Sequence, residues 1–343
     1  MKHTKRNSII ILIVTVLVLL FILKDDYHEI MFHLKNANLL WLFISIGLYF
    51  VYFLFDQLSL HNIIKQYNNK FKFQFSLYLG IITKFFNGIT PLATGGQPME
   101  VYEMHKKGIS YSNGANIVIQ NYIVFQIALV FWAIVSITLN QILHLFEYIP
   151  ILQQLTVIGF IINFIILIVL FMVSFSKNFN RVLVTFFINI GAKLNIVKDK
   201  ENSLKKWNEK CDEYYENAKV LLHNKKVFFK CVLYQVISLS IFYVLPLFIA
   251  WSLNLGDNLN IVNSIAASSY IYVMGCYVPI PGASGGMEYA FLGFFGNFLT
   301  DAPLKALLIM WRFMTYYAPT IVGALIFNIF NNQDNKAEKK EIS

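Results

Sequence analysis

The feature that most constrains this chain is a series of apolar stretches, each near the length that crosses a lipid bilayer. A transmembrane helix needs about 20 consecutive, mainly apolar residues. Hydrophobic residues make up 57% of the 343 residues and charged residues 14%, a low charged share for a soluble domain. We therefore predict an all-α polytopic membrane protein with about six full spans. The clearest stretches are residues 9–23, 39–60, 115–139, 155–175, 228–253 and 306–330.

The first apolar stretch follows a basic N-terminus, as the core of a signal peptide does. Lys24-Asp25-Asp26 stands after Leu23, where a signal peptide would carry the small residues of a cleavage site. We interpret residues 1–23 as a retained first helix.

The net charge of +9 is distributed unevenly along the chain. Most of the 28 lysines and arginines lie near the N-terminus, in 65–72, at 106–107, in 177–230 and in the tail. The segments 24–38, 140–154, 252–263 and 301–305 hold few basic residues. This asymmetry predicts a multi-pass chain with both termini on the cytoplasmic side of the membrane. The same asymmetry explains the net positive charge, so no nucleic-acid partner is expected.

Two apolar regions are interrupted by the same P-x-x-x-G-G pattern. Pro91-Leu92-Ala93-Thr94-Gly95-Gly96 breaks the first, Pro281-Gly282-Ala283-Ser284-Gly285-Gly286 breaks the second, and a glutamate follows each. The charge pattern places both ends of 73–104 on the cytoplasmic side and both ends of 262–304 on the other side. Paired breaks in two halves are typical of transporter sites near the membrane midplane. We therefore predict two oppositely oriented, broken, re-entrant hairpins that form an inverted repeat.

Broken backbone at membrane depth is tolerated where it is buried in protein or lines a wet cavity. The tips of both hairpins are therefore expected to face a shared cleft. The alternative is two ordinary kinked helices and a different number of spans.

The spans and hairpins are expected to form one domain over residues 1–330. Between them, Leu204, Trp207 and Cys211 begin a series of apolar residues at spacings of three and four. This pattern predicts an amphipathic helix at about 199–225, lying on the anionic inner leaflet or against the bundle. The alternative is a solvated linker helix that joins two repeats. The polar residues 331–343 are predicted to be a disordered cytoplasmic tail.

Ionisable side chains within predicted spans are costly, so each is a candidate functional residue. Arg312 lies about two turns into the last span, and Lys84 lies one turn deeper than the inner surface. Lys84 has a simpler interpretation as a snorkelling side chain, and Arg312 as an interfacial anchor beside Trp311. The candidates are Asp56, Lys84, Glu100, Glu103, Glu288 and Arg312.

The glycine pairs suggest how a lipid headgroup would be bound. Backbone N–H groups at a helix break form a concavity that attracts anions, and a lipid phosphate fits such a site. Lys84 and Arg312 would add positive charge, while Glu100 and Glu288 would contact a cationic part of the headgroup or hold the two cations. Alternatively, the glycines permit tight turns and close helix packing. The predicted substrate-binding set is Gly95, Gly96, Glu100, Pro281, Gly285, Gly286, Glu288, Arg312 and Lys84.

Sequence signals for enzyme chemistry are weak. The three cysteines and seven histidines are scattered, without metal-ligand spacing, so neither a metal nor a cofactor is expected. The chain lacks H-E-x-x-H, G-x-S-x-G, Walker and dinucleotide-binding patterns.

The motifs resemble those of the lysylphosphatidylglycerol synthase transmembrane family. Pro91 with Gly95-Gly96 and the later Gly108-Ile109-Ser110 resemble its first motif. Pro279-Ile280-Pro281-Gly282 with Gly285 and Glu288 resembles its second, and Arg312 with Tyr316-Tyr317 and Gly323 resembles its closing helix. The resemblance covers about residues 5–330.

In the bifunctional member of that family, the multiple peptide resistance factor, this membrane part is the flippase domain. The resemblance implies translocation of an anionic or aminoacylated phospholipid such as lysyl-phosphatidylglycerol, with a role in resistance to cationic antimicrobial peptides. That protein also has a soluble lysyltransferase domain, which we do not expect here because Ser343 follows directly after the final span. Two alternatives stay open: a phosphatidylglycerol lysyltransferase that uses lysyl-tRNA, alone or with a separate catalytic subunit, and a non-catalytic partner of an envelope enzyme. The expected partner is membrane phospholipid, and a homo-oligomer is compatible with the sequence.

Overall fold

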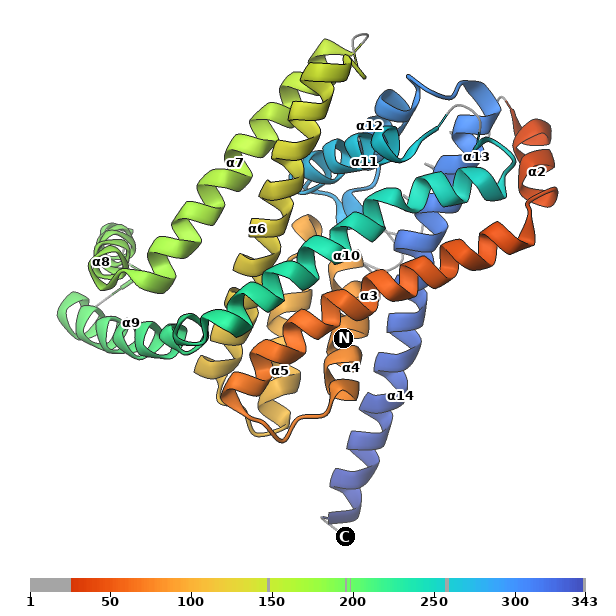
Figure 1. The fold of residues 1–343 in the computed structure, drawn as a ribbon. Coiled ribbons are helices and arrows are strands. Elements are labelled where there is room, and N and C mark those ends of the chain that lie inside the picture. Colours follow the sequence, from red (N-terminus) through yellow and green to blue (C-terminus); the bar gives the residue numbers. More distant parts are fainter. Residues whose placement is uncertain (1–25, 147–148, 195, 198, 257–258, 342–343) are drawn as a thin grey trace.

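The computed structural model describes residues 26–146, 149–194, 196–197, 199–256 and 259–341, and all regular elements in this part are helical (Figure 1). The elements of the first half are α2 (Tyr27–Lys35), α3 (Leu39–Tyr67), α4 (Phe73–Gly88), η1 (Pro91–Ala93), α5 (Gly96–Lys106), α6 (Tyr111–Leu143) and α7 (Pro150–Phe175). Those of the second half are α8 (Lys177–Lys193), α9 (Lys200–His223), α10 (Lys225–Ser252), α11 (Ile261–Gly275), η3 (Pro281–Ala283), α12 (Gly286–Phe295), α13 (Asp301–Arg312), the π-helical η4 (Phe313–Tyr317) and α14 (Ala318–Glu341).

Five helical segments of the described chain are long and apolar enough to cross a membrane. They confirm five of the six predicted spans, and the protein is a multi-pass membrane protein. The remaining prediction, residues 9–23, lies outside the described residues. The five are Leu39–Tyr67, Tyr111–Leu143, Pro150–Ser174, Lys225–Ser252 and Asp301–Asn331.

Polar residues at the ends of the apolar stretches define where several helices begin. The side chains of Asn38, Ser110, Asn224 and Asn260 each accept a hydrogen bond from a backbone N–H in the first turn of the helix that follows. Such caps satisfy donors that the helix itself leaves unpaired. The connections therefore stop and restart the helices at the predicted membrane surfaces.

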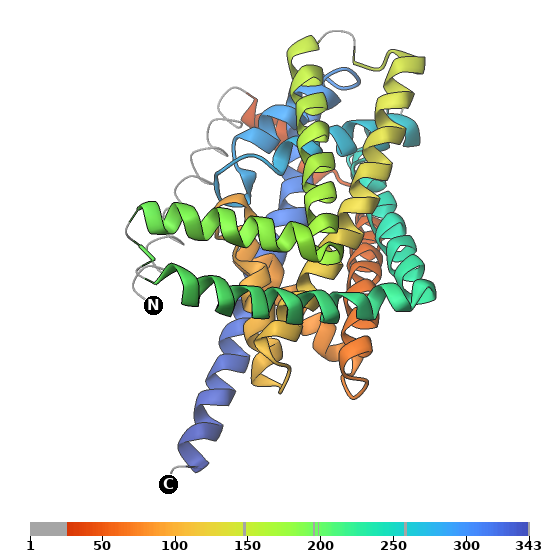
Figure 2. The same cartoon turned by 90° about the vertical axis from the view of Figure 1, so that its left-hand side faces the viewer.

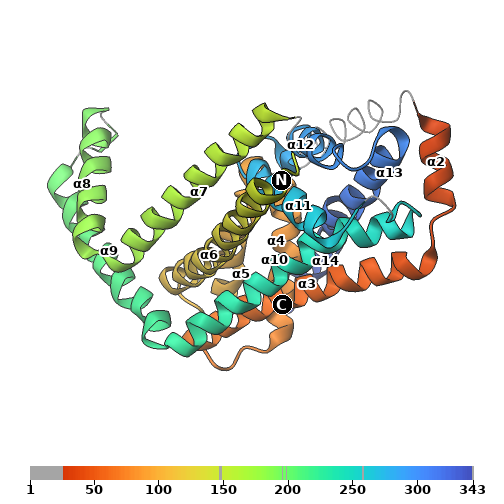
Figure 3. The same ribbon diagram turned by 45° about the horizontal axis from the view of Figure 1, so that its top comes forward.

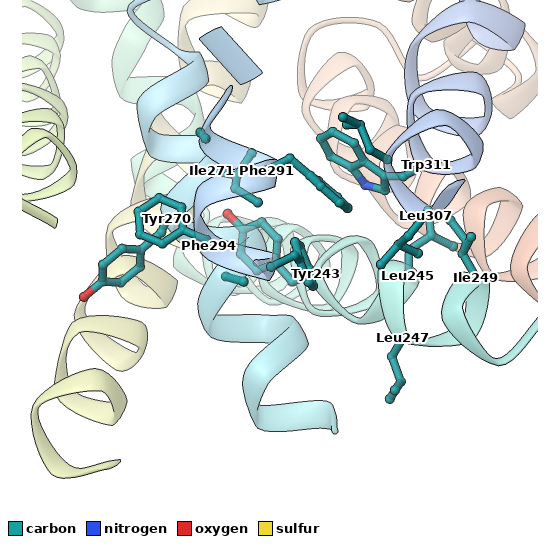
Figure 4. Close-up of a cluster of buried hydrophobic side chains, with 14 of the residues drawn as sticks. Tyr243, Leu245, Leu247, Ile249, Tyr270, Ile271, Phe291, Phe294, Leu307 and Trp311 are labelled. Atoms are coloured by element: carbon teal, nitrogen blue, oxygen red, sulfur yellow. The ribbon is translucent and has the colours of Figure 1, made fainter. Parts of the chain in front are cut away.

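The long helices α3 and α10 lie side by side across the molecule, and two apolar clusters hold the remaining elements around them (Figure 1). The larger cluster joins α10, α11, α12 and α13, where Tyr243, Phe291, Phe294 and Trp311 are fully or almost fully buried (Figure 4). In the smaller cluster, the end of α3 and the start of α6, both predicted to lie near the cytoplasm, pack against α4 and α5. Each broken hairpin therefore has its own apolar support.

The two hairpins lie toward opposite ends of the bundle, with η1 packed against η3 (Figures 1 and 2). The first comprises α4, η1 and α5, close to the predicted 73–104. The second comprises α11, η3 and α12 and ends at Phe295, shorter than the predicted 262–304, because a new helix starts at Asp301. Pro303 stands in the first turn of that helix, where a missing N–H costs nothing.

Helix α9 matches the amphipathic helix predicted at about 199–225, and it contacts α6, α7 and α10 as well as α8. The separate helix α8 was not predicted. At the other edge of the molecule, α2 packs on α13 in a segment predicted to be a loop (Figure 3). Helix α14 continues to Glu341, so residues 331–341 are helical where the sequence predicted a disordered tail.

Candidate functional site

The two breaks share one backbone conformation. The two residues after each proline have left-handed backbone, with φ of 53° at Leu92 and 51° at Ala93 in η1. The corresponding values in η3 are 63° at Gly282 and 52° at Ala283. Left-handed backbone is uncommon for residues other than glycine. Its occurrence at matched positions extends the sequence repeat to the level of the backbone.

The same hydrogen bond also closes both turns. The Thr94 hydroxyl donates to the Pro91 carbonyl oxygen over 3.0 Å, and the Ser284 hydroxyl donates to the Pro281 carbonyl oxygen over 3.1 Å. A hydroxyl residue two positions before each new helix is therefore part of the turn.

Three of the four glycine amides predicted to bind an anion already have partners within the chain. The Gly95 amide donates to Thr90 Oγ1 over 2.8 Å, and the Gly96 amide donates to Asn87 Oδ1 over 2.8 Å. The Gly285 amide donates to a carboxylate oxygen of Glu288 over 2.6 Å. In this conformation the glycines serve close packing, and an anion would reach these amides only after a rearrangement.

Arg312 and Glu288 form a buried ion pair at the second break. Arg312 Nε donates to Glu288 Oε1 over 2.6 Å, and the two side chains are 4% and 6% exposed. Arg312 Nη2 donates to the carbonyl oxygen of Gly282 over 2.9 Å. Because Glu288 also accepts from Gly285, this pair connects both sides of the break to the last span. Arg312 is too deeply buried to be an anchor at a lipid interface.

Tyr316 connects the same region to the first hairpin. Its hydroxyl donates to the carbonyl oxygen of Gly88, near the end of α4, over 3.0 Å. The Arg312 guanidinium carbon lies 4.9 Å from the centre of the Tyr316 ring, and a Cβ on Gly282 would be 2.2 Å from a ring carbon. The ring thus lies between the two breaks.

Tyr316 belongs to η4, a π-helical turn that directly follows Arg312. Single π turns inside α-helices occur frequently at functional sites. Sequence reasoning did not single out Tyr316 as a site residue, although it stands in the motif that follows Arg312. A π turn has no local sequence signature, so this contact could be found only from the structure.

Lys84 lies in a second polar cluster, between α3, α4 and α10. Its Nζ donates to the Tyr52 hydroxyl over 2.6 Å and lies 4.0 Å from Asp56 Oδ2. Gln235 on α10 donates to Asp56 Oδ1 over 3.0 Å. The Lys84 side chain is 28% exposed. Lys84 therefore pairs with α3 in this conformation, apart from the glycine break that precedes α5.

Glu100 is buried behind the first break, where it accepts a hydrogen bond of 2.7 Å from Thr83 Oγ1. Glu103, one turn later, accepts from the Tyr78 hydroxyl over 3.2 Å and lies 3.5 Å from Lys106.

The two glutamates that follow the breaks are not equivalent. Glu288 is two residues after Gly286, whereas Glu100 is four residues after Gly96. The position of the first hairpin that matches Glu288 holds Pro98. The two breaks therefore share the turn. The glutamate that pairs with Arg312 of the last span belongs to the second break and has no counterpart at the matching position of the first.

Comparison with known proteins shows that these motifs belong to a family pattern that extends over most of the chain. The family described as "Lysylphosphatidylglycerol synthase TM region" matches residues 8–323. A "UPF0104 membrane protein" of Archaeoglobus fulgidus is 23% identical over 330 residues, which cover 92% of this chain and 95% of that relative. No solved structure matches. Among the described residues, no group of three or more histidine, cysteine or acidic side chains is placed to hold a metal ion.

Proposed function

Because this chain belongs to the lysylphosphatidylglycerol synthase TM-region family, we propose that it is a lipid translocase. Its headgroup path crosses the membrane where the two broken hairpins meet. The observation that carries the proposal is the Arg312–Glu288 pair, which lies beside this meeting point with Tyr316 bridging to the first hairpin. Irregular backbone and charged side chains at membrane depth are the features that such a path requires.

The substrate is an anionic or aminoacylated phospholipid. Breaking a buried ion pair by removing one partner costs about 3–5 kcal/mol, because a charge is left without compensation. A headgroup that carries both a phosphate and an ammonium avoids this cost, since the phosphate binds Arg312 while the ammonium binds Glu288. Lysyl-phosphatidylglycerol has this combination, and its exposure on the outer leaflet would give resistance to cationic antimicrobial peptides.

Headgroup binding also changes the second break. Glu288 holds the Gly285 amide, and Arg312 holds the Gly282 carbonyl. When the headgroup separates these two side chains, both contacts loosen and the Gly285 amide becomes available to the phosphate. A ligand shifts an equilibrium only through contacts that differ between the two states, and these contacts supply that difference. The two hairpins, entering from opposite sides, then open the path alternately.

The test is translocation of labelled lysyl-phosphatidylglycerol or phosphatidylglycerol in liposomes that contain the purified protein. Arg312→Ala is expected to abolish label exposure at the outer leaflet. Lys305→Ala is the matched control, because Lys305 is a cation on the same helix that pairs with a carboxylate away from the breaks, that of Asp26 directly before α2. Both variants must remain monodisperse. Translocation by Arg312→Ala at the rate of the unmodified protein would contradict the proposal.

The same liposomes distinguish translocation from synthesis. When supplied with lysyl-tRNA and unlabelled phosphatidylglycerol, a lysyltransferase incorporates lysine into lipid, whereas a translocase alone does not. Lysine incorporation by the purified chain would support the transferase alternative.

A further inference from the structure

Helix α8 turns a stripe of large apolar side chains outward. Val182, Phe186 and Ile190 follow at spacings of four, with Phe187 beside them, so they lie on one face of the helix. Phe186 and Phe187 are 57% and 64% exposed. Contiguous exposed apolar surface marks a face that contacts a membrane or another protein.

The opposite face of α8 is directed toward α9 through charged groups. Lys177 Nζ lies 3.5 Å from Asp212 Oδ1, and Arg181 Nη2 lies 3.3 Å from Asp212 Oδ2. Ile188, near the same face, is buried. A helix pair that faced water would place its apolar side inward and its charges outward. In α8 the large apolar side chains face outward and the ion-paired side chains face α9, which favours lipid as the medium around the apolar face of α8.

The apolar face of α8 is also continuous with the lipid-facing surface of a span. Helix α7 ends at Phe175, and α8 starts two residues later. Ile161, Ile165 and Ile168 of α7 are exposed, and few residues of its span are buried within the protein. Figure 2 shows α8 and α9 running across the direction of α7. The apolar part of the bilayer that surrounds α7 therefore extends to the apolar face of α8.

The first half of α9 places more lysines than glutamates beside this apolar surface, since Glu201 and Glu209 are its acidic residues before Asp212. Lys205, Lys206 and Lys210 are exposed, and Trp207 is 51% exposed. Lys210 Nζ lies 5.0 Å from the centre of the Trp207 ring. Tryptophan and lysine together are typical of helices at the level of lipid headgroups. Lysines near a membrane surface attract anionic lipids.

We propose that α8 and α9 form an interfacial lipid-binding module. The apolar face of α8 inserts into the acyl-chain boundary of the leaflet on the basic side, and α9 binds anionic phospholipid headgroups through Lys205, Lys206 and Lys210. The module contains none of the residues that form the two breaks.

The insertion of α8 is tested by spin labels on the full chain in phosphatidylglycerol nanodiscs. The native Cys211, Cys231 and Cys276 are first replaced by serine, and one label is placed through Phe186→Cys. Thr185→Cys is the matched control, because Thr185 is exposed on the same helix but away from the apolar stripe. Collisions with oxygen and with a water-soluble nickel chelate are measured. We expect the label at 186 to be accessible to oxygen and shielded from nickel, and the label at 185 to be accessible to nickel.

Two results would overturn the insertion of α8. Equal access of nickel to both labels would place α8 in water. Shielding of the label at 186 from oxygen as well as nickel would place a protein surface there, such as a second copy of this chain.

Headgroup binding by α9 is tested by the lipids that remain bound after release from nanodiscs of mixed phosphatidylglycerol and phosphatidylcholine. Replacing Lys205, Lys206 and Lys210 with glutamine is expected to lower retained phosphatidylglycerol at least about fivefold, the effect of roughly one lysine near an anionic surface. The matched control replaces Lys336, Lys339 and Lys340, the same number of charges in α14. Unchanged retention in the α9 variant, or an equal loss in the control, would overturn this assignment.

Discussion

At the scale of single residues, the second break depends on two opposite charges that compensate each other inside the protein. Glu288 and Arg312 are both almost fully buried, and each also holds a backbone group of the break. Removal of one partner leaves a buried charge, whereas removal of both leaves an apolar contact with two unpaired backbone groups. Single and double replacements therefore have different consequences.

We predict that Arg312→Met alone destabilises the protein by about 3–5 kcal/mol and that adding Glu288→Met recovers part of this loss. The measurement is a double-mutant cycle on unfolding in mixed detergent micelles, with a coupling energy above about 0.5 kcal/mol expected for residues in contact. Translocation stays absent in the double variant, since neither headgroup contact remains. Additive effects of the two replacements on stability would mean that the ion pair does not form.

Gly282 is required by contact rather than by backbone angle. The matched residue Leu92 has nearly the same left-handed φ and carries a full side chain, so that conformation is compatible with a Cβ. At Gly282, however, a Cβ would lie 2.2 Å from the Tyr316 ring.

We therefore predict that Gly282→Ala displaces Tyr316 and weakens its hydrogen bond to Gly88. Gly285→Ala is the control, since its φ of 85° gives backbone strain but no atom lies within 4 Å of its Cβ. Strain alone costs about 1–2 kcal/mol. The midpoint of thermal unfolding should fall further for Gly282→Ala, with a larger loss of translocation. Equal effects of the two variants would mean that glycine is needed at position 282 for its backbone angle and not for its contact with Tyr316.

At the scale of elements, the sequence contained enough information for the spans and for both breaks. Apolar length determines where a helix can cross the bilayer, and Pro with Gly determines where it cannot continue. Pairings between elements were not predictable. Lys84 pairs with α3, and Thr90 and Asn87 occupy the amides of the first glycine pair, because these contacts depend on how helices pack. Helix α8 was missed because its apolar stripe is embedded in a stretch noted for its basic residues.

The packing of α14 on α4 illustrates such a pairing and is testable. A Cβ on Gly323 would lie 2.7 Å from the carbonyl oxygen of Ile81 and 2.7 Å from Phe85 Cβ. We predict that Gly323→Leu separates α14 from α4 and destabilises the protein by at least about 1–3 kcal/mol, as overpacking does. Gly47→Leu, with no atom within 4 Å of its Cβ, should leave the unfolding midpoint unchanged. A similar midpoint for both variants would show that α14 does not pack closely on α4.

At the scale of the whole molecule, the proposed translocation depends on how the two hairpins are arranged. Both hairpins have the same turn, lie toward opposite ends of the bundle and meet through η1 and η3. If they enter the membrane from opposite sides, each closes the path to one side, and Tyr316 couples the two. If both entered from one side, no alternating path would exist.

This arrangement is tested by single cysteines in a background without the native ones. Lys107→Cys lies after the first hairpin and Thr300→Cys after the second, and both positions are exposed. A membrane-impermeant maleimide applied to intact cells should label position 300 and leave position 107 unlabelled, and inverted vesicles should give the opposite result. Labelling of both positions after solubilisation controls for reactivity. The charge asymmetry is the physical reason for this expectation, because basic loops remain in the cytoplasm. Labelling of both positions from the same side would exclude the inverted repeat and, with it, alternating opening of the two breaks.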